Sequence, residues 1–383
     1  MKTDQLDNRI ASIDHYLVKN GYSSYDPYDG LFSFIGKKLV WRNQLLSRIW
    51  QQAIRLIPIN IRPIIGVKKI AHTKAVSDFS SAYCMLFNAT RDLQYEKKAK
   101  DQLNFLESIS IHTPNGLGWG LRFPFATRFV KADADQPNIF QTINAIHSFL
   151  DGHVAFGGSH YLDIAKKGFL FLKNDLGFAE RGDAIYWKYW KGLDVEIYNV
   201  SGLMIGLCAR MWHLCAEQEY LVFSQKLYKY IGQAQNEDGS WHYSADPKGR
   251  FIDGFHTGYI LEGIIKGIIY GAIRKDEILD KGVNFYLANF FTEDGIPRYF
   301  HHSTFPIDGQ NAAQALQTLN FIFNVNFAEK ERLEACLGQI DKLLWNKKGY
   351  YNYKKTKILT YSTPMHRWVT GPMFLALVYI RYS

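Results

Sequence analysis

Apolar helices rich in small residues recur along the chain at intervals of roughly 57 residues. Stretches such as DFSSAYCMLFNATRDL and EIYNVSGLMIGLCARM combine large apolar side chains with Gly, Ala and Ser. The pattern predicts six such helices, which begin near Asp78, Asn138, Glu196, Asp253, Asp308 and His366.

A turn that combines glycine with aromatic residues precedes most of these helices, at 116–123, 182–190, 238–243, 294–300 and 349–353. A more amphipathic helix, for example LVFSQKLYKYIGQAQ, lies between each apolar helix and the next turn. Two-helix repeats stack, because one pair cannot bury its own apolar face. The sequence therefore predicts an all-α fold, an (α/α)6 toroid with six inner apolar helices, six outer amphipathic helices and short aromatic hairpin turns at one end.

The predicted toroid occupies residues 37–383. We expect residues 1–36 to precede the repeat as one helix, at about 5–20, followed by an ordered loop. No Pro/Gly/Ser-rich stretch is long enough to be a linker, which favours a single domain overall.

Composition supports a large packed core, with 47% apolar and 15% aromatic residues. No run of 18 apolar residues indicates a transmembrane helix, and the first residues lack the apolar region of a signal peptide. The four cysteines form no CxxC pair and lie in apolar, helical contexts, which favours reduced thiols. These features predict a cytoplasmic protein.

The net charge of +9 comes from one segment. Nine basic residues and no acidic residue lie between Gly30 and Ser77, and the rest of the chain is balanced. The segment mixes bases with Trp, Leu and Ile at helical spacing, which suits an anionic membrane surface or an acidic partner. The alternative is an outer helix that packs its apolar side on the core. Nucleic acid is not an expected partner, because no binding motif is present.

In a toroid the inner helices start at one end, where their N-termini and the aromatic turns gather. Such an end suits anions and sugars, since helix dipoles attract negative charge and aromatic rings stack on sugar rings. The predicted catalytic residues are Asp253 and His256 as the acid/base pair and Asp308 as a second carboxylate. The predicted substrate-binding residues are Asn138, Gln141, Glu196, Asn199, Trp119, Arg122, Trp241, Tyr299, Gln310 and Arg367.

Structural roles remain open for these residues. Asp253 and Asp308 are good helix N-caps, and the aromatic turns could fill the end of the barrel. His256 could be a base, because a helix N-terminus favours neutral histidine, or a hydrogen-bonded wall residue. Arg367 lies within an inner helix, where a lone charge is costly. It requires an ion pair or a substrate carboxylate.

The chain has no His/Cys/Asp set with zinc-ligand spacing, no Asp-x-Asp-Asp acid, no GxSxG and no P-loop. We therefore predict no metal and no cofactor.

Five motifs support a family resemblance, namely YDPYDGL (25–31), INIRPIIGVKK (59–69), IDGFHTGYILEGI (252–264), FHHSTFPIDGQNAAQAL (300–316) and MHRWVTGPMFLAL (365–377). The chain resembles bacterial exopolysaccharide and capsule biosynthesis proteins of the VpsJ type, which are described as prenyltransferase/squalene-cyclase-like toroids. The resemblance implies a role in surface-glycan production and assigns no catalytic residue. The family pattern places a histidine after PID, where this chain has Gln310.

The leading hypothesis is a toroid that binds or modifies an acidic surface glycan or its lipid-linked precursor. Uronate epimerase, lyase or hydrolase chemistry is the expected activity. Arg122 or Arg367 would bind a substrate carboxylate, and Trp119, Trp241 and Tyr299 would stack on sugars. One alternative is a non-catalytic assembly protein whose segment 37–74 docks on the inner membrane or on a glycosyltransferase. Another, terpenoid or prenyl-chain chemistry, requires an acidic cluster or metal site.

Overall fold

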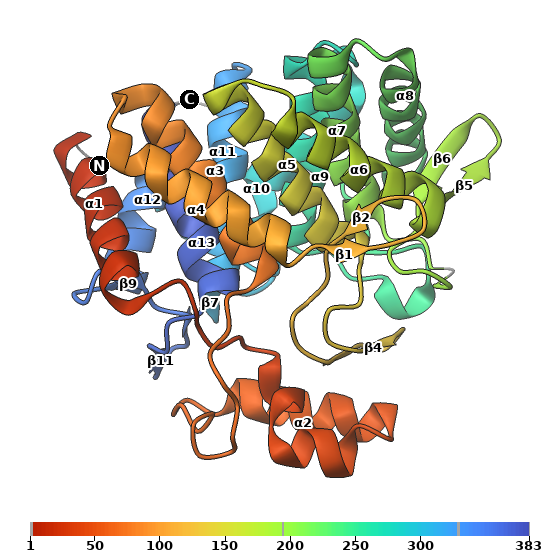
Figure 1. Ribbon diagram of the computed structural model, residues 1–383. Coiled ribbons are helices and arrows are strands. Elements are labelled where there is room, and N and C mark those ends of the chain that lie inside the picture. Colours follow the sequence, from red (N-terminus) through yellow and green to blue (C-terminus); the bar gives the residue numbers. More distant parts are fainter. Residues whose placement is uncertain (1–2, 194, 328–329, 383) are drawn as a thin grey trace. The chain divides into compact units, whose positions relative to one another are not determined.

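The computed structural model describes residues 3–193, 195–327 and 330–382, and these are almost entirely helical (Figure 1). The chain divides into two compact units. The central unit is Leu176–Leu343. The terminal unit combines the described residues up to Asp175 with those from Leu344 onward.

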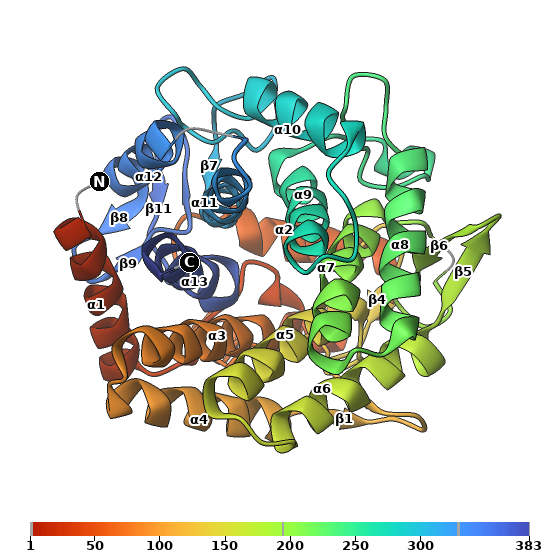
Figure 2. The same ribbon diagram turned by 90° about the horizontal axis from the view of Figure 1, so that it is seen from above.

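In the terminal unit, three apolar helices pack side by side, with α3 in contact with both others (Figure 2). They are α3 (Thr73–Thr90), α5 (Ile139–Phe156) and α13 (Gly371–Tyr382). Each has an outer partner, respectively α4 (Leu93–Ser108), α6 (His160–Leu170) and α1 (Thr3–Asn20). Small residues allow the inner helices to approach closely, since the Ser148 hydroxyl on α5 donates to the Ser77 carbonyl on α3 at 2.8 Å.

The central unit repeats this arrangement with α7 (Tyr198–Cys215), α9 (Gly254–Ile269) and α11 (Gly309–Asn324) as neighbouring inner helices. Helix α8 (Gln218–Gln233) packs on α7, α10 (Glu277–Asn289) packs on α9, and α12 (Lys330–Leu344) follows α11. Glycines bring α7 and α9 into backbone contact. A Cβ atom at Gly263 would lie 1.8 Å from the Gly202 carbonyl oxygen.

The strands are short and form turns between helices. In the terminal unit they are β1 (Ile111–His112), β2 (Leu117–Gly118), β3 (Phe125–Ala126), β4 (Lys131–Ala132), β8 (Trp345–Asn346), β9 (Tyr350–Tyr351), β10 (Lys354–Lys355) and β11 (Thr360–Tyr361). In the central unit they are β5 (Phe178–Arg181), β6 (Ala184–Trp187) and β7 (Ile307–Asp308). Antiparallel hairpins join β1 to β2, β3 to β4, β5 to β6, β8 to β9 and β10 to β11.

Three details differ from the sequence-based predictions. Helix α3 begins at Thr73 rather than near Asp78, because Lys74 forms an ion pair with Asp78 at 2.8 Å and allows both charges inside the helix. Helix α7 begins at Tyr198, so Glu196 precedes its first turn. A π-helical turn, His366–Thr370, leads into α13, and the N-terminal helix α1 takes the outer position beside α13.

The four cysteines are free thiols, and burial raises the pKa of Cys208 and Cys336. Within the described residues, no helix is both long and apolar enough to cross a membrane.

Candidate functional site

Asp253 and His256 form a hydrogen-bonded pair at the start of α9. Asp253 is the N-cap, and its Oδ1 accepts the backbone N–H of His256 at 2.7 Å. The other oxygen, Oδ2, lies 2.7 Å from the ring Nδ1 of His256. The Asp253 side chain is fully buried, whereas 21% of the His256 side chain is exposed. The carboxylate is therefore held inside the protein and the imidazole reaches the surface.

This geometry assigns roles to the two ring nitrogens of His256. A carboxylate only accepts hydrogen bonds, so Nδ1 donates to Asp253. In the neutral ring the second nitrogen, Nε2, then carries the lone pair and can accept a proton. Asp253 also stabilises the imidazolium that would form. A histidine oriented by a buried carboxylate is the arrangement that general acid–base catalysis requires.

Aromatic rings surround His256. The ring of Tyr243 meets it edge-on at 4.6 Å between centroids, and Phe255 lies at 4.9 Å. Phe251 stacks on Tyr243 at 5.0 Å and 12°, and both rings are partly exposed. The predicted sugar-stacking residue Tyr299 is also partly exposed, and its carbonyl accepts the N–H of Gly254 at 2.9 Å. The structure thus brings Tyr299 beside the start of α9.

A row of polar side chains joins α9 to α11. The Gln310 amide donates to the Tyr259 hydroxyl at 3.4 Å, and Gln314 donates to Glu262 at 2.8 Å. Lys266 also donates to Glu262, at 2.6 Å. The Oε1 atom of Gln310 is buried without a hydrogen-bond partner in the described structure. Such amide and carboxylate groups can bind sugar hydroxyls.

Glu262 and Lys266 were not among the predicted site residues. The signal that could have found them is their i,i+4 spacing in an otherwise apolar helix, where a charge requires a partner.

Asp308 is the N-cap of α11. Its Oδ1 accepts the backbone N–H groups of Gln310 and Asn311 at 3.0 and 3.4 Å, and the residue is buried. The predicted second carboxylate therefore has a structural role, as capping explains its position.

Glu196 and Asn199 lie near the start of α7. One oxygen of Glu196 accepts from Arg181 of β5, and the other accepts from the Tyr230 hydroxyl of α8 at 2.9 Å. Both carboxylate oxygens of Glu196 therefore have partners within the central unit, on β5 and on the outer helix. Asn199 is buried, and its Oδ1 has no hydrogen-bond partner within the described structure.

Asn138, Gln141 and Arg122 make structural contacts in the terminal unit. Asn138 caps α5 by accepting the N–H of Gln141, and Gln141 in turn accepts the N–H of Lys74 at 3.2 Å. These bonds connect the starts of α5 and α3. Arg122 donates to the Ala71 carbonyl at 3.1 Å.

Arg367 forms a buried, bidentate ion pair. Its Nε and a terminal nitrogen donate to the two carboxylate oxygens of Asp26 at 2.6 and 2.8 Å. Burial alone would raise the pKa of Asp26, but the Arg367 guanidinium outweighs it and the pKa is lowered. Of the two roles open for Arg367, the structure shows the ion pair. The two guanidinium nitrogens that would bind a substrate carboxylate already bond to Asp26. The predicted substrate-binding role of Arg367 is therefore wrong.

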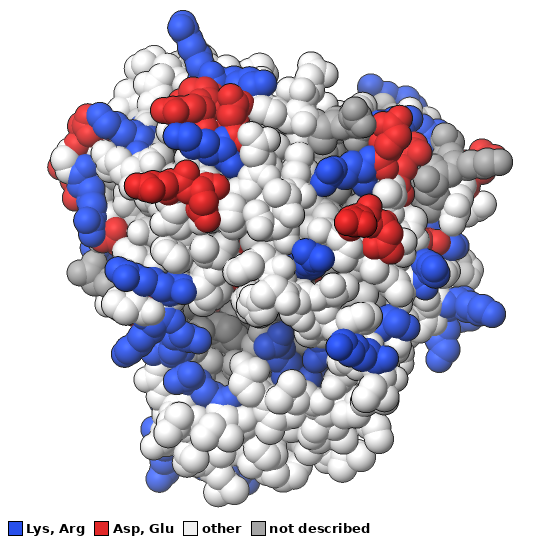
Figure 3. Space-filling view, turned by 180° about the vertical axis from the view of Figure 1, so that it is seen from behind, with Lys and Arg blue, Asp and Glu red and all other residues white. Residues whose placement is uncertain are grey.

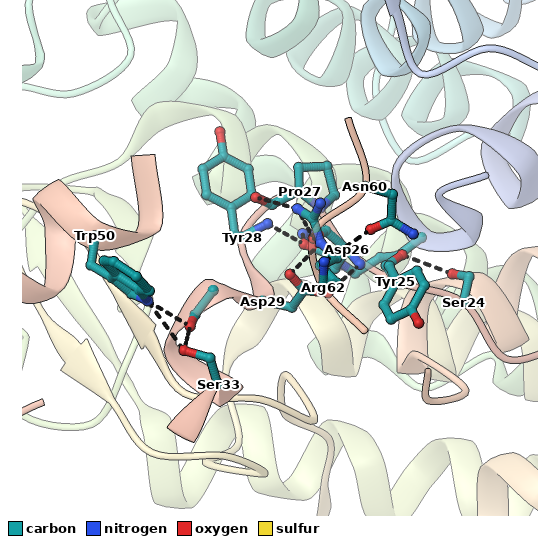
Figure 4. Close-up of polar contacts among 12 residues, drawn as sticks. Ser24, Tyr25, Asp26, Pro27, Tyr28, Asp29, Ser33, Trp50, Asn60 and Arg62 are labelled. Carbon is teal, nitrogen blue, oxygen red and sulfur yellow. Dashed lines mark hydrogen bonds and ion pairs between the residues drawn. The ribbon is translucent and has the colours of Figure 1, made fainter. Parts of the chain in front are cut away.

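A second buried ion pair, between Arg62 and Asp29, lies beside Asp26 (Figure 4). Arg62 donates to Asp29 at 2.7 Å and to the Asp26 carbonyl at 2.9 Å, and the Asp26 N–H donates to Asp29. Buried ion pairs therefore connect three motifs, YDPYDGL, INIRP and HRW. Burial also lowers the pKa of the nearby His72 and His366 to about 4, which keeps both neutral near pH 7.

Trp119 and Trp241 belong to the core rather than to an exposed site. Trp119 is 0% exposed and Trp241 is 2% exposed. The indole N–H of Trp119 donates to the Leu106 carbonyl on α4, and that of Trp241 donates to the Ile231 carbonyl on α8. The predicted stacking role of these two rings is wrong, because neither presents a face to a ligand. Among the described residues, no group of three or more His, Cys, Asp or Glu could hold a metal ion.

Comparison with solved structures establishes the fold class. A possible member of glycoside hydrolase family 105 from Salmonella enterica has a TM-score of 0.66, with 11% identity over 100% of this chain and 94% of that chain. A family 76 glycoside hydrolase (mannosidase) from Bacteroides thetaiotaomicron scores 0.65, with 12% identity over 99% and 98%. Cellobiose 2-epimerase from Bacillus thermoamylovorans scores 0.63, with 10% identity over 80% and 87%.

The chain has the all-α, (α/α)6 toroid fold. No family model matches its sequence, and no curated protein does. Because identity to the solved structures is so low, the likeness concerns fold, and activity has to be argued from the site.

Proposed function

We propose that this protein modifies an acidic bacterial surface polysaccharide, with His256 as the catalytic base and Asp253 as the residue that orients it. The observation that carries the proposal is the 2.7 Å contact between buried Asp253 and partly exposed His256. Similar solved structures named as a mannosidase and an epimerase support carbohydrate chemistry. The resemblance to VpsJ-type proteins supports surface polysaccharide as the substrate.

The proposed step removes a proton from a sugar carbon next to a carboxylate. The C–H proton moves to Nε2 of His256, and the electron pair is delocalised into the carboxylate. Delivery of a proton from water to the opposite face, with release of the first proton from His256 to solvent, gives the epimer. Alternatively the bond from the neighbouring carbon to its glycosidic oxygen breaks, that oxygen takes the proton from the imidazolium and leaves as an alcohol, and an unsaturated sugar remains. Asp253 stabilises the imidazolium between these steps.

Neighbouring side chains in the central unit would position the sugar. Tyr243, Phe251 and Tyr299 offer partly exposed rings for stacking. Arg298, next to Tyr299, replaces Arg367 as the proposed partner of the substrate carboxylate. Its carbonyl oxygen would lie 2.8 Å from a Cβ atom on Gly254, and its Nε is buried without a hydrogen-bond partner in the described chain.

The test compares polysaccharide from a deletion strain with that from strains carrying wild type, His256→Ala or Asp253→Asn. We expect both variants to give the polysaccharide of the deletion strain. His160→Ala changes an exposed histidine of the terminal unit and serves as the matched control.

A second assay separates catalysis from binding. Polysaccharide from the deletion strain is incubated with purified protein in D2O, and NMR follows deuterium at the sugar carbons. Wild type should incorporate deuterium and His256→Ala should not. Wild-type polysaccharide from cells carrying either site variant would contradict the proposal.

A further inference from the structure

Helix α2 (Gln44–Leu56), in the basic segment of the terminal unit, buries the polar side chains of Ser47 and Gln51. Gln51 is buried, donates to the Ala126 carbonyl at 3.1 Å and accepts the Ala126 N–H at 3.2 Å. Buried Ser47 donates to the Val40 carbonyl at 2.9 Å. On the same side of the helix, Ile54 forms an apolar cluster with Ile65 and Val67, and the partly buried Trp50 packs against it.

The opposite face of α2 is apolar and exposed. Leu45, Ile49 and Leu56 are spaced i, i+4 and i+11 and are 60%, 57% and 60% exposed. A surface helix of a globular protein normally shows the reverse pattern, with apolar residues inside and polar residues outside. The sequence-based alternative, an outer helix with its apolar side on the core, applies to Trp50 and Ile54 but not to Leu45, Ile49 and Leu56.

The apolar surface extends beyond the helix. Between Phe34 and Ile64 lie eight of the seventeen large apolar side chains that are exposed in the described part of the chain. Scattered exposed apolar residues are ordinary, but a concentration of this kind marks an interaction surface.

A second segment, distant in sequence, adds the same kind of surface. The hairpin of β10 and β11 contacts α2, because the Tyr361 hydroxyl donates to the Leu56 carbonyl at 3.0 Å and Arg55 donates to the Tyr353 hydroxyl at 3.1 Å. At the hairpin tip, Ile358 is 91% exposed. We name α2, its flanking residues 34–43 and 57–69, and the tip 356–359 the basic apolar face.

Positive charge accompanies the apolar residues. Arg62 and Lys74 are used in buried ion pairs with Asp29 and Asp78, but other bases of this face are exposed, namely Lys37, Lys38, Arg42, Lys68, Lys69 and Lys357. No acidic residue occurs between Asp29 and Asp78. Figure 3 shows the same distribution, since the lower part of the visible face, where α2 lies in Figure 1, carries blue and white atoms and no red ones.

We propose that the basic apolar face docks on an anionic lipid bilayer, independently of the activity proposed above. Exposed leucines and isoleucines would enter the boundary between headgroups and acyl chains, and the surrounding lysines and arginines would contact lipid phosphates. A protein partner fits less well, because lysine is depleted at protein–protein interfaces.

The test is co-sedimentation with vesicles of phosphatidylcholine alone or mixed with phosphatidylglycerol. We expect the full-length protein to sediment with the mixed vesicles only, and less at high salt. Leu45→Ser/Ile49→Ser and Ile358→Ser/Leu359→Ser should weaken binding, and Lys37→Glu/Lys38→Glu should weaken it about tenfold or more. Because all six residues are exposed, the variants should fold.

Matched controls change equally exposed residues elsewhere. Leu93→Ser on α4 and Lys347→Glu/Lys348→Glu after β8 should bind like wild type. Sedimentation with neither vesicle overturns the proposal, as does equal binding by all variants. A dimer that Leu45→Ser/Ile49→Ser converts to a monomer would assign the face to a second copy instead.

Discussion

The carboxylate of Asp253 contacts both the backbone N–H and the ring Nδ1 of His256, each at 2.7 Å. One residue therefore begins helix α9 and fixes the orientation of the imidazole. Capping and chemistry are often treated as alternative explanations of an aspartate before a helix. Here the first oxygen serves the helix and the second serves the histidine.

The two functions of Asp253 can be separated by substitution. Asparagine caps a helix as well as aspartate does, whereas alanine does not. We expect Asp253→Ala to lower the free energy of unfolding by about 1 kcal/mol more than Asp253→Asn, measured by urea denaturation. Both variants should lose the activity proposed for His256. Equal stability of the two variants would show that the cap contributes nothing.

Backbone contact between α7 and α9 predicts a strong effect at Gly263. A Cβ atom there would lie 1.8 Å from the Gly202 oxygen, so Gly263→Ala should destabilise the protein by roughly 1–3 kcal/mol or more. The control is Gly338→Ala on α12, where a Cβ atom would meet nothing within 4 Å. That change should stabilise by about 0.5–1 kcal/mol, since alanine favours helix. Thermal melting of both variants tests the contrast.

The buried histidines predict a loss of stability in acid. The folded-state pKa of His366 is about 4, below its ordinary value of 6.5, because burial disfavours the charged ring. As the pH falls from 6.5 to 4, the unfolded chain binds a proton that the folded chain does not, and stability falls. One such histidine lowers the free energy of unfolding by about 3 kcal/mol as the pH falls over this range.

His366→Phe keeps a ring beside Phe79 and removes this titration. Between pH 6.5 and 4, urea denaturation should show that the variant loses roughly 3 kcal/mol less free energy of unfolding than wild type. His72 is present in both proteins, so its contribution cancels. Parallel curves for the two proteins would mean that His366 does not titrate as described.

The ion pair between Asp26 and Arg367 predicts non-additive mutations. Asp26→Asn or Arg367→Met alone leaves a buried polar group or charge and should cost about 3–5 kcal/mol. The double variant should cost clearly less than the sum, because neither charge is left alone. A double-mutant cycle by chemical denaturation measures this coupling, and additive costs would contradict a direct interaction.

The helix pairs were predictable because their signal is local. Apolar periodicity and small residues identified the inner helices, and Asn138, Asp253 and Asp308 are N-caps where the sequence placed helix starts. The start of α3 was misplaced, because Asp78 looks like a cap residue until its buried partner Lys74 is known.

The site was less predictable because its contacts join distant segments. Asp26 and Arg367 are 341 residues apart, so no local pattern assigns Arg367 to this ion pair rather than to a ligand. Aromatic turns likewise do not reveal from sequence whether an aromatic ring faces the core, as that of Trp119 does, or partly faces solvent, as that of Tyr243 does. The contact between Asp253 and His256 was predictable because both residues lie within one helix turn.

The tautomer of His256, measured by ¹⁵N NMR of histidine-labelled protein, tests the central claim most directly. If Asp253 accepts from Nδ1, neutral His256 carries its proton on Nδ1 in wild type. In Asp253→Asn the amide can donate to Nδ1, and the proton should move to Nε2. An Nε2–H ring in wild type, or the same tautomer in both proteins, would contradict the account.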